Sequence, residues 1–268
     1  MTGVPRRLLA SEWRKVTTTK MLVSLAAISL VFTAVNVATL LLVGSGALPG
    51  MPQSGDGDLL LDPEFIGTVL GEAGAAATFV LVLGIIAMTG EFRHMTITST
   101  FLATPRRGRV LGAKLALFAV LGAGLAVANV VLAVTLTAIA LVGREHAPIT
   151  AGTVASVLVG AVVGMTLYAV LGVSLGAVIK NQVVAIALAL VWVLLVEGLF
   201  GVLLPEVGKW LPGGALNAAM NISLTADMTG GLTEADALPP WAAALVLAAY
   251  AGVLALLASR TTMRRDIT

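Results

Sequence analysis

The sequence has no cysteine and few charged residues. Without cysteine the chain cannot form disulfide bonds, attach haem through thioethers or bind a metal through thiolates. The two histidines, His94 and His146, stand apart and lack partners at metal-ligand spacing, so we assign neither to a metal. Charged residues make up 11% of the chain, against about 25% in soluble domains, and the mean hydropathy is +1.01. These features indicate an integral membrane protein.

Apolar residues dominate six stretches, each long enough to cross a bilayer, which takes about 20 residues. The alternation typical of barrel strands is absent, and a backbone in lipid must satisfy its own hydrogen bonds, so we expect helices. The predicted spans are residues 21–43, 66–89, 115–142, 151–179, 183–204 and 241–259. The first has no suitable cleavage site, so we expect it to be retained. The predicted fold class is an all-α integral membrane protein with one membrane-spanning domain over residues 1–268.

The distribution of Lys and Arg predicts the orientation of the chain. With the amino terminus in the cytoplasm, every cytoplasmic segment is basic. The outer segments then carry only two basic residues, Arg144 and Lys209. Most acidic residues then fall outside. This asymmetry also explains the pI near 9.2, so we expect contact with the lipid bilayer and no nucleic-acid partner. We predict a multi-pass protein of the plasma (bacterial inner) membrane with both termini cytoplasmic.

Two segments outside the spans have their own pattern. Residues 4–19 predict an amphipathic interfacial helix, which is either a membrane anchor or an elbow helix that also contacts a cytoplasmic partner. Residues 205–240 predict short helices that re-enter the outer leaflet, the alternative being an ordinary surface loop. The apolar face of the first helix is expected to hold Val4, Leu8, Leu9, Trp13 and Val16.

Small residues recur every four positions along the fourth span, with Tyr168 as the one interruption. Such spacing lets two helix backbones approach closely in lipid. It does not say whether the neighbouring helix belongs to this chain or to another one. The predicted helix-packing positions are Gly160, Gly164, Gly172 and Gly176.

Glu72 and Glu197 lie inside the second and fifth predicted spans. Carboxyl groups within a membrane are costly and often mark a transport pathway. Both residues lie near the outer ends of their spans, so each carboxyl group could instead reach water. We keep both interpretations open.

Residues 90–114 form a charged segment between two apolar runs, which we expect to be an aqueous loop. Phe92, Met95 and Leu102 recur near helical spacing before Pro105, which predicts a short helix on the membrane face that contacts a partner. Glu91 is expected to form an ion pair with Arg14 or Lys15 rather than to act in catalysis. The chain shows no phosphate-binding loop and no catalytic triad, so we do not expect an enzyme.

This segment, the amphipathic start and the six spans together resemble type-2 exporter permeases of the ATP-binding-cassette (ABC) class. In those permeases an acidic residue after the second span precedes a Thr-rich helix, then Thr-Pro, basic residues and a Lys. The Gly-, Ala- and Val-rich composition is similar to that of actinobacterial members. The residues that carry the resemblance are Glu91, Thr96, Thr98, Thr104, Pro105, Arg106, Arg107 and Lys114.

The resemblance implies a permease that pairs with a second permease copy, or a related one, and with two copies of a separate ATPase that holds ATP and Mg. The coupling segment would be residues 90–108, the exit would be capped by 205–240, and Glu72 and Glu197 would line the path. The cargo would be a hydrophobic or amphipathic compound. Rival functions are an ion-coupled secondary transporter using Glu72 and Glu197, or a membrane scaffold. The implied ATPase contacts are Glu91, Phe92, Arg93, His94, Met95, Thr96, Thr98, Phe101 and Leu102.

Overall fold

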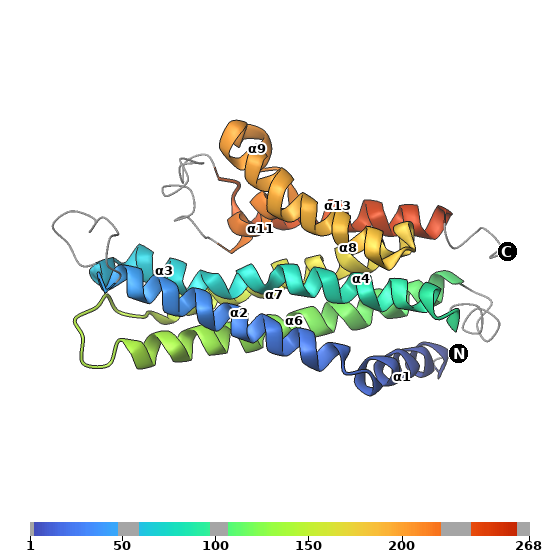
Figure 1. Ribbon diagram of the computed structural model, residues 1–268, viewed down its shortest axis with the longest axis horizontal. Helices are drawn as coiled ribbons and strands as arrows, with labels where there is room; N and C mark the ends of the chain where they lie inside the picture. The colour runs from blue at the N-terminus through green and yellow to red at the C-terminus, as the bar shows by residue number, and fades with distance from the viewer. Residues whose placement is uncertain (1–2, 48–58, 97–106, 221–236, 262–268) are drawn as a thin grey trace.

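The computed structural model describes residues 3–47, 59–96, 107–220 and 237–261, and all regular structure in these ranges is helical (Figure 1). The elements are α1 (Gly3–Thr18), α2 (Met21–Gly44), η1 (Leu59–Leu61), α3 (Pro63–Gly71), η2 (Glu72–Ala76), α4 (Ala77–Arg93), α6 (Arg107–Ala140), α7 (Ala151–Ile179), α8 (Gln182–Val191), η3 (Trp192–Val196), α9 (Glu197–Leu203), α10 (Pro205–Gly208), α11 (Pro212–Ala219) and α13 (Pro240–Thr261).

Within the described ranges, six helical stretches are long and apolar enough to cross a membrane. The prediction of an all-helical chain with six such stretches is therefore confirmed. The second stretch runs through α3, η2 and α4, and the fifth runs through α8, η3 and α9. The stretches are Met21–Gly44, Pro63–Arg93, Gly108–Ala140, Ala151–Ile179, Gln182–Leu203 and Pro240–Arg260.

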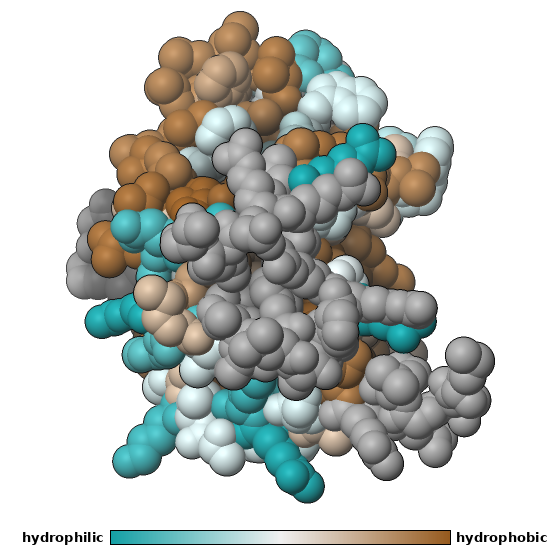
Figure 2. Space-filling view, turned by 90° about the vertical axis from the view of Figure 1, so that its right-hand side faces the viewer, coloured by the Kyte–Doolittle hydropathy of each residue, from teal (hydrophilic) through white to brown (hydrophobic). Residues whose placement is uncertain are grey.

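Helix α7 lies at the centre of the fold, with α4, α6 and α13 packed along it and α2 packed on α6. The stretch Pro63–Arg93 is 67% buried over its most apolar window, whereas Gln182–Leu203 is only 11% buried. Helix α8 lies beside α4 and α7, and the stretch then rises away from them to α9 at the top of Figure 1. Figure 2 looks onto the end of the molecule where α1 lies and shows hydrophobic side chains over this upper part. The fifth stretch is thus the peripheral one.

Glycine allows the central contacts on α7 to be this close. A Cβ atom on Gly172 would overlap the Leu81 carbonyl oxygen of α4, and one on Gly176 would lie 2.9 Å from the Ile85 carbonyl oxygen. At the end of α11, Gly160 faces Ala219 and Met220, and Gly164 faces the side chains of Leu216 and Met220. The small residues of α7 therefore allow close packing within this chain. The first half of α7 packs against α11, and the second half packs against α4.

The helices extend further into the charged segment than the predicted spans. Helix α4 continues through Glu91 to Arg93, and α6 already begins at Arg107. Lys114 was expected in an aqueous loop but is a helical residue only 3% exposed. The reason is that two carboxylates from other helices compensate its charge, which allows the lysine to be buried.

The face of α1 that turns toward the protein also differs from the expected one. Leu8 and Val16 pack against the core and Glu12 between them is buried, whereas Leu9 and Trp13 are 38% and 48% exposed. The expected apolar face is therefore divided between the protein and the outside. The side chain of Val4 lies outside the described residues.

Candidate functional site

Four charged side chains from three helices meet where α1 packs on the bundle. We call Glu12 and Lys15 of α1, Glu91 of α4 and Lys114 of α6 the charge cluster. Lys15 Nζ lies 2.6 Å from Glu12 Oε1 and 2.7 Å from Glu91 Oε1. Lys114 Nζ lies 2.6 Å from Glu12 Oε2 and 3.0 Å from Glu91 Oε1. Each lysine thus bridges the same two carboxylates. Arg14, the other expected partner of Glu91, is exposed.

The charge cluster is buried except on one side. Glu12, Glu91 and Lys114 are 2%, 6% and 3% exposed, while the Lys15 side chain is 38% exposed. Burial raises the pKa of the Glu12 carboxyl group, but Lys114 and Lys15 outweigh it and bring that pKa below its ordinary value. Burial lowers the pKa of Lys15, but Glu12 and Glu91 outweigh it and raise that pKa. Glu12 and Lys15 are therefore both charged near neutral pH.

The end of α4 carries the first of the expected coupling residues. Phe92 is half-buried, with Lys180 Nζ 5.8 Å from its ring centroid, and Arg93 donates to the Gln182 side chain at 3.4 Å. His94 and Met95 are exposed in a turn where Met95 has a φ of +56°. This left-handed turn ends the helix just beyond the charge cluster.

Thr96, the next residue, is helical again and exposed. The remaining coupling candidates, Thr98, Phe101 and Leu102, lie outside the described residues, as do Thr104, Pro105 and Arg106. The coupling segment is therefore described only at its two ends, and both ends lead directly into the charge cluster.

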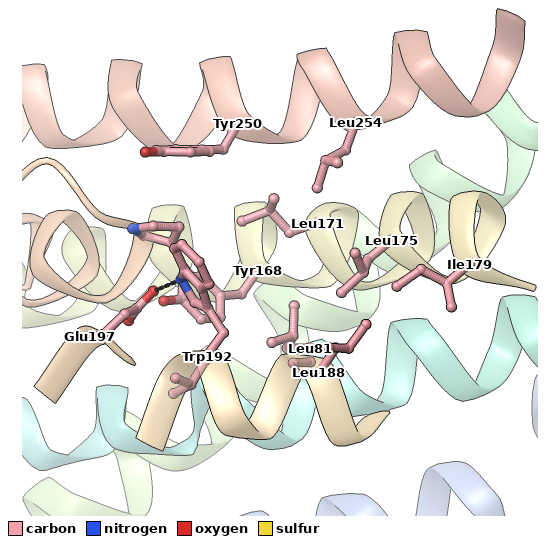
Figure 3. A pocket seen from close by; sticks show the side chains of 13 residues that line it. Leu81, Tyr168, Leu171, Leu175, Ile179, Leu188, Trp192, Glu197, Tyr250 and Leu254 are labelled. Atoms are coloured by element: carbon pink, nitrogen blue, oxygen red, sulfur yellow. Dashed lines mark hydrogen bonds between the residues drawn. The ribbon is translucent and has the colours of Figure 1, made fainter. Parts of the chain in front are cut away.

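A second site is an apolar groove with a cavity of about 350 Å³ between α4, α7, the α8–α9 stretch, α11 and α13 (Figure 3). Five of its thirteen lining residues are leucine, and its polar groups gather at one end around Glu197. The groove is lined by Leu81, Tyr168, Leu171, Leu175, Ile179, Leu188, Ala189, Trp192, Val193, Glu197, Pro212, Tyr250 and Leu254.

Helix geometry places Trp192 beside Glu197. The indole Nε1 donates to Glu197 Oε1 at 2.7 Å, and the backbone N–H of Gly213 donates to the same carboxyl group. In an α-helix, residues five apart point about 140° away from each other. Trp192–Val196 is instead a π-helical segment, whose i→i+5 hydrogen bonds bring residues five apart to nearly the same face.

Tyr168 of α7 forms the floor of the groove beside Glu197. The side chain is 1% exposed, and its hydroxyl group has no hydrogen-bond partner among the described residues. It interacts electrostatically with Glu197, and Figure 3 shows the two polar ends directed toward the same region. A buried hydroxyl group without a partner is rare in proteins.

The structure does not bring the two expected pathway acids together. Glu72 is the first residue of η2, which packs against α2 and α6, and it is not among the residues that line the groove. Glu197 is the acid at the groove. Each acid adjoins a helical segment that departs from α geometry: Glu72 begins a 3₁₀ segment, and Glu197 follows the π-helical one.

Sequence reasoning missed Glu12, Trp192 and the role of Tyr168. Tyr168 had a visible signal, since it interrupts the small-residue pattern of α7. Glu12 had a weaker signal, since it lies four residues from both Leu8 and Val16.

Comparison with protein-family models and with curated protein sequences gives no match. Among the described residues, no three His, Cys, Asp or Glu side chains group closely enough to hold a metal ion.

Proposed function

We propose that this chain is the membrane-spanning permease subunit of an ATP-driven exporter, resembling the type-2 ABC class. Two copies of a separate ATPase would supply ATP, Mg and hydrolysis. The permease would pair with a second copy or a related chain and carry a hydrophobic or amphipathic compound outward through the plasma membrane. The α1 end would face the cytoplasm, with both termini on that side.

The observation that carries the proposal is the charge cluster. It connects α1, α4 and α6 directly beneath the two ends of the coupling segment. A displacement applied to residues 92–96 would therefore move three helices together, because breaking a buried ion pair is costly. The exposed side chains of Arg93, His94 and Met95 are available for contact with an ATPase.

Helix α11 supports the expected cap near the exit. It packs on α7 at Gly160 and Gly164, well inside the fourth spanning helix. Figure 1 likewise shows α11 alongside the bundle and not beyond its end. This position suits a short helix that re-enters the outer leaflet. A backbone at that depth must be covered by other parts of the protein, and here α7 covers α11.

The test is to co-express the chain with the ATPase encoded beside it and to measure ATP hydrolysis in nanodiscs. We expect the chain to change the hydrolysis rate, and we expect Arg93→Glu or Phe92→Ala to return the rate to that of the ATPase alone. Arg260→Glu, at an exposed arginine on the same end, is the matched control. If no ATPase binds, or if both variants couple normally, the proposal is wrong.

One observation favours ion-coupled transport as a second candidate. Both membrane acids adjoin non-α segments, where backbone groups are freer to bind an ion than in a regular helix. In vesicles without ATP, such a transporter would move its cargo along an imposed proton or sodium gradient. Glu72→Gln and Glu197→Gln would both abolish that movement. Transport that requires ATP and persists in both variants would exclude this candidate.

A further inference from the structure

We propose that the groove between α4, α7, α8–α9 and α13 binds a lipophilic amine: a small molecule with an apolar body and one protonated nitrogen. The ammonium group would lie between the Glu197 carboxyl group and the Tyr168 hydroxyl group, and the apolar body would lie along the leucine wall. The inference specifies the cargo class of the proposed exporter and rests on that function only for its biological purpose.

The size and walls of the groove fit a small organic molecule. Its volume of about 350 Å³ falls within the usual range of about 300–1,000 Å³ for small-molecule sites. Leu171 and Leu175 of α7, Leu254 of α13 and Leu188 of α8 form its apolar part (Figure 3).

The charge of the groove selects a cation. Among the described lining residues Glu197 is the only acid, and none is Lys or Arg. Trp192 and Gly213 use two of the roughly four acceptor positions of this carboxyl group. No protein cation compensates it there, so a cationic ligand would gain a charge-assisted hydrogen bond where water competes little.

The unpartnered hydroxyl group of Tyr168 is a second and independent indication of a ligand. Leaving a buried polar group unsatisfied typically costs about 1–3 kcal/mol, and an ammonium donor placed next to Glu197 would relieve that cost. The rings of Trp192 and Tyr250 border the same end of the groove and can stabilise a cation through their faces.

Other occupants fit these groups less well. An acyl chain fills the apolar part but leaves Glu197 and Tyr168 without a new partner. The phosphate of a zwitterionic phospholipid finds no lysine or arginine among the described lining residues. An anionic amphiphile is repelled by the carboxylate. Only a molecule that combines an apolar body with a lone positive charge satisfies both parts of the groove.

The experiment uses two matched fluorescent probes and the full chain in phosphatidylcholine nanodiscs, without any ATPase. Dansylcadaverine carries one primary ammonium group, and its N-acetyl derivative is neutral. We expect saturable binding of the amine above the signal of empty nanodiscs. The neutral derivative should bind at least about tenfold more weakly than the amine, because it loses one charge-assisted hydrogen bond.

Two variants assign the binding to the groove. Glu197→Gln keeps an acceptor for Trp192 but removes the charge, and it should erase the difference between the two probes. Tyr168→Phe removes only an unpartnered hydroxyl group, so the fold should not suffer, but amine binding should weaken about threefold. Glu206→Gln, at an exposed acid ion-paired with Lys209, should change nothing and is the control.

Several outcomes would overturn the inference: no saturable binding of the amine, equal binding of both probes, unchanged binding in both variants, or displacement of the amine by phosphatidylethanolamine. Because this assay contains no ATPase, its failure is separate from failure of the proposed function. A chain that binds the amine but couples to no ATPase would support the groove and refute the exporter.

Discussion

Lys114 of α6 and Glu12 of α1 form a buried ion pair, with Nζ 2.6 Å from Oε2 and both side chains at most 3% exposed. This pair attaches the amino-terminal helix to the bundle through charge as well as through apolar packing. Its strength can be measured against that of an exposed pair in the same chain.

We predict that Lys114→Met strongly destabilises the protein, by about 3–5 kcal/mol, because Glu12 and Glu91 then remain buried with Lys15 alone. Thermal unfolding in detergent measures the loss. The control is Lys209→Met, whose partner Glu206 is 72% exposed; that variant should cost less than about 1 kcal/mol. Similar losses in both variants would mean that the charge cluster does not stabilise the fold.

Stability should fall at acidic pH because of Glu12. The folded state lowers the pKa of Glu12 below its ordinary value of 4.5. Its contribution is therefore present above pH 4.5 and disappears as the pH falls through the lower folded-state pKa. Melting curves at stepwise lower pH should show this loss, and Glu12→Gln should reduce the slope. A variant with the same acid sensitivity as the original chain would contradict the assignment.

Lys15 predicts the opposite dependence at alkaline pH. Its pKa is raised above the ordinary value of 10.5 in the folded state. The contribution of Lys15 is complete below pH 10.5 and disappears as the pH rises through the higher folded-state pKa. The Lys15→Met variant should lose less stability than the original chain between pH 10 and the end of the measurable range. Melting temperatures of the two proteins across this range provide the comparison.

Gly172→Ala should destabilise the contact between α4 and α7 by about 1–3 kcal/mol, because the new methyl group overlaps the Leu81 backbone. Gly124→Ala is the matched control, since a Cβ at that exposed position of α6 meets no atom within 4 Å. Alanine also forms helices more readily than glycine, so this control should be neutral or slightly stabilising. Denaturant titration of the two variants tests the difference.

A buried amide group links α2 to α6 and offers another measurement. Thr33 Oγ1 donates to Asn129 Oδ1 at 2.8 Å, and both side chains are fully buried. Asn129→Leu should cost about 1 kcal/mol, in the range of hydrogen bonds between membrane helices. Asn36→Leu should cost less, because Asn36 donates within α2, to the Phe32 carbonyl oxygen. Equal losses would show that the interhelical bond contributes little.

Hydropathy was enough to predict the spans because about 20 consecutive apolar residues allow few other structures. It could not place Lys114 or Glu91, since a charged residue beside a span is normally assigned to water. Burial of these residues depends on Glu12 and Lys15, which reach them only once α1 has packed against α6. A pair between Glu91 and Lys15 was expected from the sequence and is present. The addition of Glu12 and Lys114 to that pair is a tertiary property that no local pattern contains.

The groove was harder to predict for the same reason. Glu197 was visible as an acid within a span, but its neighbour Trp192 lies five residues earlier, on a different face of any regular α-helix. The π-helical segment that joins them has no signal in WVLLV, which is simply apolar. Tyr168 interrupted a small-residue pattern, yet only the arrangement of α7, α11 and α13 shows what it faces.

The π-helical turn at Trp192–Val196 should let the fifth spanning stretch accept the loss of one residue. Removing one residue there would let the turn tighten to an ordinary α-helix while the following residues keep their orientation. The same deletion in α8 would rotate everything after it by about 100°. The chain thus has one place in this stretch where a codon can be lost without turning the carboxyl group away from its site.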